Sequence, residues 1–219
     1  MQADFFRDNL LDFFQKCLSA PYITVGDDVD YYVKKVGGRL EIYFESSNGT
    51  RDWITNLRFP SLPYKGMDIK YRVHGGFLKS WKSLEDIMLP IVLDTTIKEV
   101  IIIGYSHGGA LAMLCHEFCW YHRPDLRDTT RTYGFGAPRV FNGWVIPKKL
   151  KPRWQNFRVV RNGHDIVTHL PFLILRFRHV GKIIKIGGLF KYGPINSHRP
   201  ENYINELVIH EKKKRKKLR

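Results

Sequence analysis

One short apolar run near the middle of the chain limits how the chain can fold. Residues 100–103 read Val-Ile-Ile-Ile and place an apolar side chain on both faces of any strand they form. Such a strand needs cover on both faces, as a central strand of a parallel sheet has. The run passes directly into Gly104-Tyr105-Ser106-His107-Gly108 and then into small residues at the start of a helical pattern. We therefore predict a buried strand that turns sharply into a helix.

Strand and helix patterns alternate through the middle of the chain, which is typical of an α/β layered fold. Further strands are predicted at residues 31–36 and 40–44 around a Gly37-Gly38 turn, at 131–135 and 157–161, and as a late hairpin within 174–186. Helices are predicted at 4–18 with Asp4 as the cap, 77–93 with a bend or break at Pro90, 107–122 and 200–210, and a short helix or helical turn is predicted at 51–57. No internal repeat and no interdomain linker interrupts this pattern.

The net charge of +15 is unevenly distributed. Residues 1–144 carry 17 basic and 17 acidic residues, whereas residues 145–219 carry 19 basic and 4 acidic residues. We expect a domain of residues 1–210 and a solvated, mobile basic tail of residues 211–219. Three roles for the tail stay open: solubility, attraction to an anionic membrane surface, and nucleic-acid binding or a nuclear address. The chain has no finger, helix-turn-helix or RNP-like pattern, so no specific nucleic-acid binding is predicted.

Several features bear on the compartment. The N-terminal residues lack the order of a signal peptide, and no apolar run approaches the roughly 20 residues of a membrane-spanning helix. The three cysteines form no cluster with metal-ligand spacing, and Cys115 and Cys119 are interpreted as packing residues of one buried helix. We expect a reducing, cytoplasmic location, with a peripheral position at a membrane as the alternative, and no metal or organic cofactor.

Ser106 is the main candidate for a catalytic residue. Gly104-Tyr105-Ser106-His107-Gly108 fits the G-x-S-x-G pattern and lies between an apolar strand and a helix start, which is the context of a nucleophile elbow. The sharp turn lifts the serine hydroxyl above the sheet, and Gly104 and Gly108 leave room for neighbouring backbone. The following helix N-terminus favours negative charge that develops there.

A serine hydroxyl needs a base to remove its proton and usually a carboxylate to orient that base. Asp165 follows the predicted strand 157–161, at the edge where α/β sheets keep functional groups. His198 lies in a polar loop before the last helix, so Ser106, Asp165 and His198 follow the chain order of an α/β-hydrolase triad. His169, His179 and His210 are the alternative bases downstream.

Five sequence blocks resemble the class 3 lipase family of α/β-hydrolases, over roughly residues 40–207. They are Ile-Tyr-Phe-Glu-Ser-Ser at 42–47 with Trp-Ile-Thr-Asn-Leu at 53–57, Val-His-Gly-Gly-Phe at 73–77, the elbow at 104–112, Tyr-Gly-Phe-Gly-Ala-Pro-Arg-Val at 133–140, and residues 158–171 around Asp165. The resemblance implies an α/β-hydrolase fold with a mostly parallel central sheet flanked by helices. It also implies a cofactor-free lipase or esterase that cleaves lipid acyl esters, of triacylglycerol or of phospholipid as in a phospholipase A1.

The resemblance further assigns roles to single residues. Ser106, Asp165 and His198 match the catalytic triad, whereas His169 matches a His-Leu-Pro segment and His179 a strand position. The backbone N–H groups of His107 and Ser47 match the oxyanion donors. Ser46 is the alternative to Ser47, because Glu45-Ser46 replaces the Arg-Gly or Gly-Gly of many members.

Two questions stay open at this level. Residues 50–64 lie where family lids lie, and they are interpreted either as a lid over the acyl pocket or as a packed loop. The alternative functions are an esterase or thioesterase acting on a non-lipid ester, and a non-catalytic lipid-binding module. If the protein acts on lipids or binds them, its basic C-terminal half is a candidate surface for contact with an anionic membrane.

Overall fold

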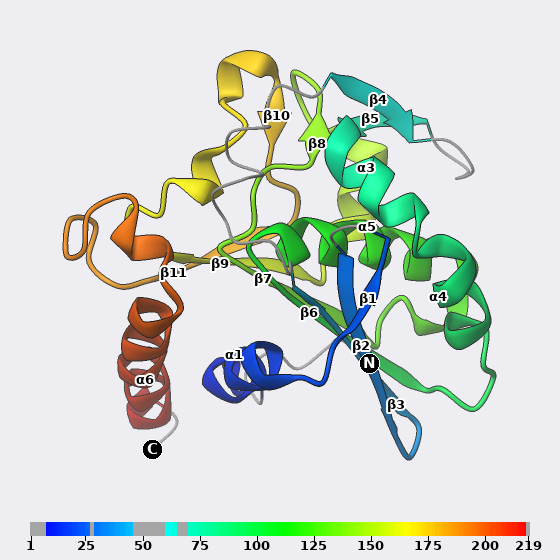
Figure 1. Ribbon diagram of the computed structural model, residues 1–219, viewed down its shortest axis with the longest axis horizontal. Helices are drawn as coiled ribbons and strands as arrows, with labels where there is room; N and C mark the ends of the chain where they lie inside the picture. Colours follow the sequence, from blue (N-terminus) through cyan, green and yellow to red (C-terminus); the bar gives the residue numbers. More distant parts are fainter. Residues whose placement is uncertain (1–7, 27–28, 46–59, 65–69, 218–219) are drawn as a thin grey trace.

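The central layer of the protein is a seven-stranded sheet in the order β1-β2-β3-β6-β7-β9-β11 (Figure 1). The computed structural model describes residues 8–26, 29–45, 60–64 and 70–217. The strands are β1 (Ile23–Val25), β2 (Val29–Val36), β3 (Arg39–Glu45), β6 (Glu99–Tyr105), β7 (Thr130–Phe135), β9 (Phe157–Asn162) and β11 (Lys182–Ile186). From β3 to β11 all neighbours pair in parallel, while β2 is antiparallel to β1 and β3. The predictions for 31–36, 40–44, 100–103, 131–135 and 157–161 are confirmed.

Helices cover both faces of this sheet. They are α1 (Leu10–Ser19), α3 (Gly75–Lys82), α4 (Glu85–Val92), α5 (His107–His122) and α6 (Pro200–Lys217). Helices α1 and α6 lie on one side, and α3, α4 and α5 on the other (Figure 1). Alternate residues of β6 accordingly enter two different cores, Val100 and Ile102 on the α5 side and Ile101 and Ile103 on the α1 side. The all-apolar run is thus buried on both faces, as its sequence predicts.

A second, antiparallel sheet lies beyond the carboxyl end of β7. Its strands are β10 (Phe177–Arg178), β8 (Phe141–Asn142), β5 (Tyr71–His74) and β4 (Ser61–Tyr64), in that order. The predicted hairpin at 174–186 is therefore wrong, because β10 joins this second sheet whereas β11 pairs in parallel with β9. Gly181 makes the switch possible: its φ is +72°, and a Cβ there would lie 2.3 Å from the backbone oxygen of Phe157.

Two helix predictions need correction at their ends. The predicted helix 77–93 is two helices, because the N–H of buried Leu84 donates to the Trp81 carbonyl at 2.9 Å and closes α3 there. Pro90 lies inside α4 and does not end it. The described part of α1 is capped by Asn9 rather than Asp4, since the Asn9 side chain accepts from the Asp12 N–H. Asp4 and the predicted helix 51–57 lie outside the described residues.

The C-terminal helix continues past its predicted end. Sequence patterning ends it at His210, before a free tail of residues 211–219, but α6 runs to Lys217. The side chain of Glu211 is buried against the start of α1, where its Oε1 accepts the Leu10 N–H at 3.1 Å. A carboxylate at a helix N-terminus is favourable, because it pairs an otherwise unbonded N–H and faces the positive end of the helix dipole. Lys214 adds a bond to the Asp8 carbonyl at 2.5 Å.

The described residues contain no helix long and apolar enough to cross a membrane. Within the same ranges, no group of three or more His, Cys, Asp or Glu side chains is placed to hold a metal ion. Cys115 and Cys119 are free and buried in α5, which confirms that they are packing residues.

A buried histidine in α5 makes the fold sensitive to acid. The His116 ring nitrogens lie 2.7 Å from Thr132 Oγ1 and 2.8 Å from the Arg153 carbonyl oxygen. Burial lowers the pKa of His116 from 6.5 to about 4, because the charged ring would lose its hydration. The unfolded chain therefore binds the proton first. The stabilising contribution is complete above pH 6.5 and is lost as the pH falls toward 4.

We expect the free energy of unfolding to fall by about 3 kcal/mol between pH 6.5 and pH 4 through His116, at about 1.4 kcal/mol per pKa unit. When the free energy of unfolding is measured with urea at each pH, it should fall less steeply with decreasing pH for His116→Gln than for the wild type. His179, whose pKa burial lowers to about 3, supplies part of the remaining slope. Identical slopes for the two proteins would contradict this origin of acid sensitivity.

Candidate active site

Ser106 occupies the sharp turn between β6 and α5. Its φ of 55° and ψ of −121° are a strained conformation for a residue with a side chain. The turn requires two close backbone approaches: a Cβ on Gly104 would lie 2.1 Å from the Gly108 oxygen, and one on Gly108 would lie 2.1 Å from the Phe44 oxygen. The two glycines of the G-x-S-x-G pattern therefore allow helix α5 to begin directly against β6 and β3.

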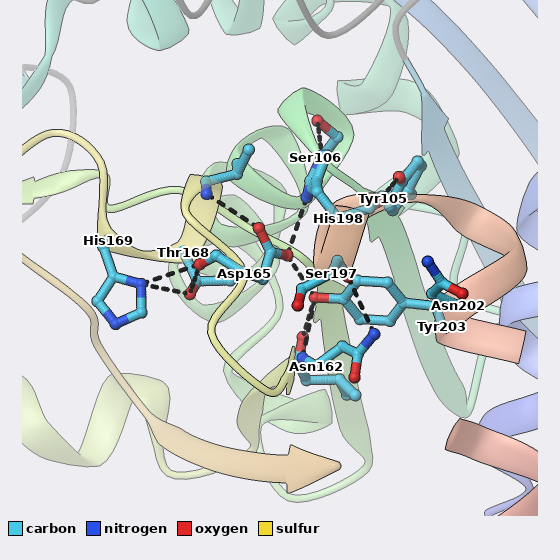
Figure 2. A network of polar contacts seen from close by, with 12 residues as sticks. Tyr105, Ser106, Asn162, Asp165, Thr168, His169, Ser197, His198, Asn202 and Tyr203 are labelled. Atoms are coloured by element: carbon cyan, nitrogen blue, oxygen red, sulfur yellow. Dashed lines mark hydrogen bonds and ion pairs between the residues drawn. The ribbon is translucent and has the colours of Figure 1, made fainter. Parts of the chain in front are cut away.

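The hydroxyl of Ser106 lies against the ring of His198. Ser106 Oγ is 2.9 Å from His198 Nε2, and His198 Nδ1 is 2.8 Å from Asp165 Oδ2 (Figure 2). An ionised carboxylate can only accept, so Nδ1 carries the proton and donates to Asp165. Nε2 is then the free acceptor that faces the serine hydroxyl. This is the tautomer that a general base for Ser106 needs.

Three segments far apart in the sequence converge here. Ser106 follows β6, Asp165 lies three residues after β9, and His198 ends a short 3-10 helix (Asn196–His198) before α6. The Asn162 side chain joins the last two segments, because its Nδ2 donates to the Ser197 carbonyl at 3.0 Å. Gly136, at φ +58°, also makes room, since a Cβ there would lie 2.8 Å from His198 Cε1.

The carboxylate of Asp165 is fully buried and has three donors. Besides His198, the Tyr203 hydroxyl donates to Oδ2 at 2.6 Å and the Val167 N–H donates to Oδ1 at 2.9 Å. Burial and the nearby Asp165 charge raise the pKa of Tyr203 well above 10, so its hydroxyl keeps the proton that it donates. These bonds fix the position of the carboxylate that accepts from His198.

A second tyrosine holds the histidine. The Tyr105 ring stacks on the His198 ring with centroids 5.2 Å apart and planes 19° from parallel. The Tyr105 hydroxyl also donates to the His198 backbone carbonyl. Tyr105 immediately precedes the serine, so the same turn positions both the hydroxyl and the base.

None of the other candidate bases is placed by the described structure to accept the proton of Ser106. His169 Nδ1 lies 2.9 Å from the backbone oxygen of Asp165, and His179 Nε2 lies 2.6 Å from the Thr168 carbonyl. His210 lies in the second half of α6, twelve residues beyond His198. Each ring is therefore engaged with backbone or remote from the serine.

One of the two predicted oxyanion donors can be located. His107 is the first residue of α5, so its backbone N–H belongs to the open N-terminal turn beside Ser106. Its ring packs on Phe77, with centroids 5.4 Å apart. Ser47 and its alternative Ser46 lie outside the described residues, as does most of the candidate lid at 50–64.

A family model described as lipase (class 3) matches residues 42–175 of the chain. The chain belongs to the class 3 lipase family. The sequence-based identification of the family is confirmed, and the fold of the chain is that of the α/β-hydrolases, as predicted.

Individual relatives are fungal. A lipase of Rhizomucor miehei is 31% identical over 152 residues, which cover 65% of this chain and 40% of that protein. Lipase A of Sodiomyces alcalophilus is 34% identical over 116 residues, covering 45% of this chain and 27% of that protein. The chain thus aligns with less than half the length of either relative.

Solved structures agree in fold. The Rhizomucor miehei lipase in complex with its propeptide superposes with a TM-score of 0.68 at 23% identity, over 95% of this chain and 81% of that one. Lipase II of Rhizopus niveus gives 0.64 at 27% identity, over 80% and 68%. A triacylglycerol lipase described as having a serine protease triad as its catalytic centre gives 0.62 at 27%, over 76% and 65%.

The role of Tyr203 was not predicted from the sequence. Position 203 fits an apolar position of α6, and its side chain is fully buried. The available signal is chemical: a tyrosine at a buried helix position needs a partner for its hydroxyl. That partner is the Asp165 carboxylate, which makes Tyr203 a positioning residue rather than a catalytic one.

We expect Tyr203→Phe to lower kcat by about ten- to a hundredfold, because the Asp165 carboxylate loses one of the three donors that hold it in position to orient the His198 ring. Without this donor the Asp165 charge is less well compensated and stabilises the protonated His198 ring more. The acidic limb of the kcat/KM profile should therefore move to higher pH. A drop in kcat with an unmoved pH profile would indicate a packing role only, and Tyr192→Phe, on a half-buried tyrosine bonded to Glu206, is the matched control.

Proposed function

We propose that the protein is a serine hydrolase that cleaves carboxylic esters of lipids. One observation carries the proposal: the continuous hydrogen-bonded chain from Ser106 Oγ through His198 to Asp165, at 2.9 and 2.8 Å. The family membership supports it, as does the similarity to a triacylglycerol lipase with a serine protease triad. Triacylglycerol and phospholipid acyl esters are the leading substrates.

The proposed reaction passes through an acyl-enzyme. Ser106 Oγ attacks the ester carbonyl carbon while His198 Nε2 takes the hydroxyl proton. The tetrahedral oxyanion is held by the His107 N–H and, by family resemblance, that of Ser47, each commonly worth about 3 kcal/mol. His198 then protonates the leaving alcohol, and the acyl group stays on Ser106.

The second half returns the enzyme to its starting state. A water molecule gives a proton to His198 Nε2 and attacks the acyl carbonyl carbon. Collapse of this second intermediate breaks the bond to Ser106 Oγ, which takes the proton back, and the carboxylic acid leaves. Asp165 stays ionised throughout and stabilises the transient charge on His198.

A substrate panel tests the proposal. We expect hydrolysis of p-nitrophenyl esters of rising chain length, of a triacylglycerol emulsion and of phospholipid vesicles, with release of acyl chains from the sn-1 position indicating phospholipase A1 activity. A preference for acyl thioesters would point to a thioesterase instead. Lipid binding without cleavage of any ester would indicate a non-catalytic binding module.

We also propose that the lipid is met at an anionic membrane surface. Residues 145–199 carry twelve basic residues against one acidic residue, the buried Asp165. Such a segment is attracted to anionic headgroups, and the attraction is weakened by salt.

A further inference from the structure

An apolar ridge projects from the second sheet. It consists of Trp144, Val145 and the four consecutive residues Phe172, Leu173, Ile174 and Leu175. The exposed fractions are large, reaching 62% at Trp144, 73% at Val145 and 84% at Ile174. Isolated exposed apolar side chains are ordinary, but six in two adjoining loops form a patch of the kind that marks an interaction site.

The two loops of the apolar ridge are joined by specific contacts. The Gly143 N–H donates to the Arg176 carbonyl at 2.9 Å, and Asn142 Nδ2 donates to the Leu175 carbonyl at 2.8 Å. The Arg176 guanidinium lies 4.4 Å from the centre of the Trp144 ring. Strands β8 and β10 pair directly below. The ridge is therefore a built feature of the fold, with its apolar side chains held outward.

The chain next to the apolar ridge in sequence is basic, and we call these residues its basic rim. Arg176 and Arg178 follow it in the chain, and the exposed Lys148, Lys149 and Lys151 come three to six residues after Val145. No acidic residue lies between Asp128 and Glu201 except the buried Asp165. An apolar centre whose flanking sequence is positively charged complements a surface that is apolar inside and negative at its edge, as an anionic bilayer is.

The ridge lies on the side of the central sheet that carries Ser106. Packed rings lead from its strand to the elbow: Phe177 on His74 at 5.4 Å, His74 on Phe77 at 4.4 Å, and Phe77 on His107 at 5.4 Å. Figure 1 shows β8 and β10 at the upper edge of the molecule and the C-terminus at the lower edge. A surface held by the ridge would face the candidate active site.

We propose that the apolar ridge and its basic rim dock the protein onto an anionic lipid bilayer. Trp144 and residues 172–175 enter the headgroup region, and the arginines and lysines of the rim contact lipid phosphates. The inference rests on the proposed function in one respect: it places the lipid substrate next to Ser106.

The C-terminal end of α6 is not part of this surface. The helix has 18 residues and begins two residues after His198, so its basic end lies about 20 Å or more away along the axis. This distance exceeds the Debye length of about 8 Å at physiological salt. The lysines of α6 therefore contribute little to a bilayer that touches the ridge, although they carry a large share of the positive charge.

Binding is measured with the Ser106→Ala protein, so that no lipid is cleaved. In sedimentation with phosphatidylcholine vesicles, with and without phosphatidylserine, we expect tighter binding to the anionic vesicles and weaker binding as salt rises. Adding Phe172→Ala and Ile174→Ala should weaken binding by about tenfold or more, because two large apolar contacts are lost. Adding Val36→Ala, at an exposed site on β2, should leave it unchanged.

Two triple variants that remove the same charge distinguish the basic rim from the C-terminal end of α6. Replacing Lys148, Lys149 and Lys151 by Gln should weaken binding to anionic vesicles by about tenfold or more. Replacing Lys212, Lys213 and Lys216 by Gln removes the same charge from exposed positions on α6 and should change binding less than twofold. Equal losses in the two triple variants, or none in the first, would overturn the proposal.

Trp144 supplies a direct readout of insertion. Its fluorescence should shift to the blue on binding and be quenched by lipids brominated near the headgroup, and Trp144→Phe should remove this signal.

The proposal would be overturned if the ridge instead mediates a dimer, seen as a change of mass that is lost in Phe172→Ala/Ile174→Ala. Turnover of a soluble short-chain ester, measured with Ser106 intact, should match wild type in the ridge variant. Vesicle binding without any esterase activity would refute the proposed function alone.

Discussion

Ser106→Ala should fold normally and lose on the order of a million-fold in turnover of every ester that the wild type cleaves. The loss is large because Ser106 Oγ is the only atom of the triad that forms a bond to the substrate carbon. Without it, His198 and Asp165 have no nucleophile to activate. The fold should survive, since alanine is smaller and the strained backbone at φ 55° is held by Gly104 and Gly108. Steady-state kinetics beside a thermal melt measure both effects.

The chemical identity of the nucleophile can be checked separately. A fluorophosphonate reacts with serines whose proton is removed by a neighbouring base. We expect the label at Ser106 in the wild type and no label in Ser106→Ala or His198→Ala. Peptide mass spectrometry that finds the label at another serine, such as Ser197 beside the base, would show that the elbow is not the reactive site.

Local patterns in this chain carry information about contacts that are close in sequence. The apolar run at 100–103 and the Gly37-Gly38 turn each follow from a few neighbouring residues, and each is found as predicted. The G-x-S-x-G elbow is also found as predicted. Gly104 is needed for a local approach to the Gly108 oxygen, whereas Gly108 is needed for an approach to the Phe44 oxygen, 64 residues earlier. Ser106, Asp165 and His198 could be proposed from chain order and the family resemblance, and the structure brings them within hydrogen-bonding distance.

Features decided by distant partners were not predicted. Helix α6 continues to Lys217 because Glu211 meets the start of α1, about 200 residues earlier in the chain. Residues 177–178 leave the expected hairpin because β8, not β11, is their partner. The second donor to Asp165 comes from Tyr203, whose helical spacing indicates only packing. In each case the deciding atom belongs to an element that the local pattern does not contain.

Positions with positive φ show the same limit from the backbone side. Gly136 lies in a sequence block that matches the family, but the physical need for glycine there comes from the His198 ring and the Asp165 carboxylate, 62 and 29 residues later. No local rule reveals that a side chain would collide with the base.

His198→Ala should be as damaging as Ser106→Ala, whereas His169→Ala should leave most activity in place. Removal of His198 takes away both the acceptor of the serine proton and the donor to the leaving alcohol, so turnover should again fall on the order of a million-fold. His169 is half-buried and bonds to the Asp165 backbone, so its loss should cost about 1 kcal/mol of stability with a small change in kcat. Kinetics and urea unfolding of the two variants decide between them. A folded His169→Ala protein without activity, beside an active His198→Ala protein, would move the base to His169 and leave the hydrogen bond between Ser106 and His198 without a catalytic role.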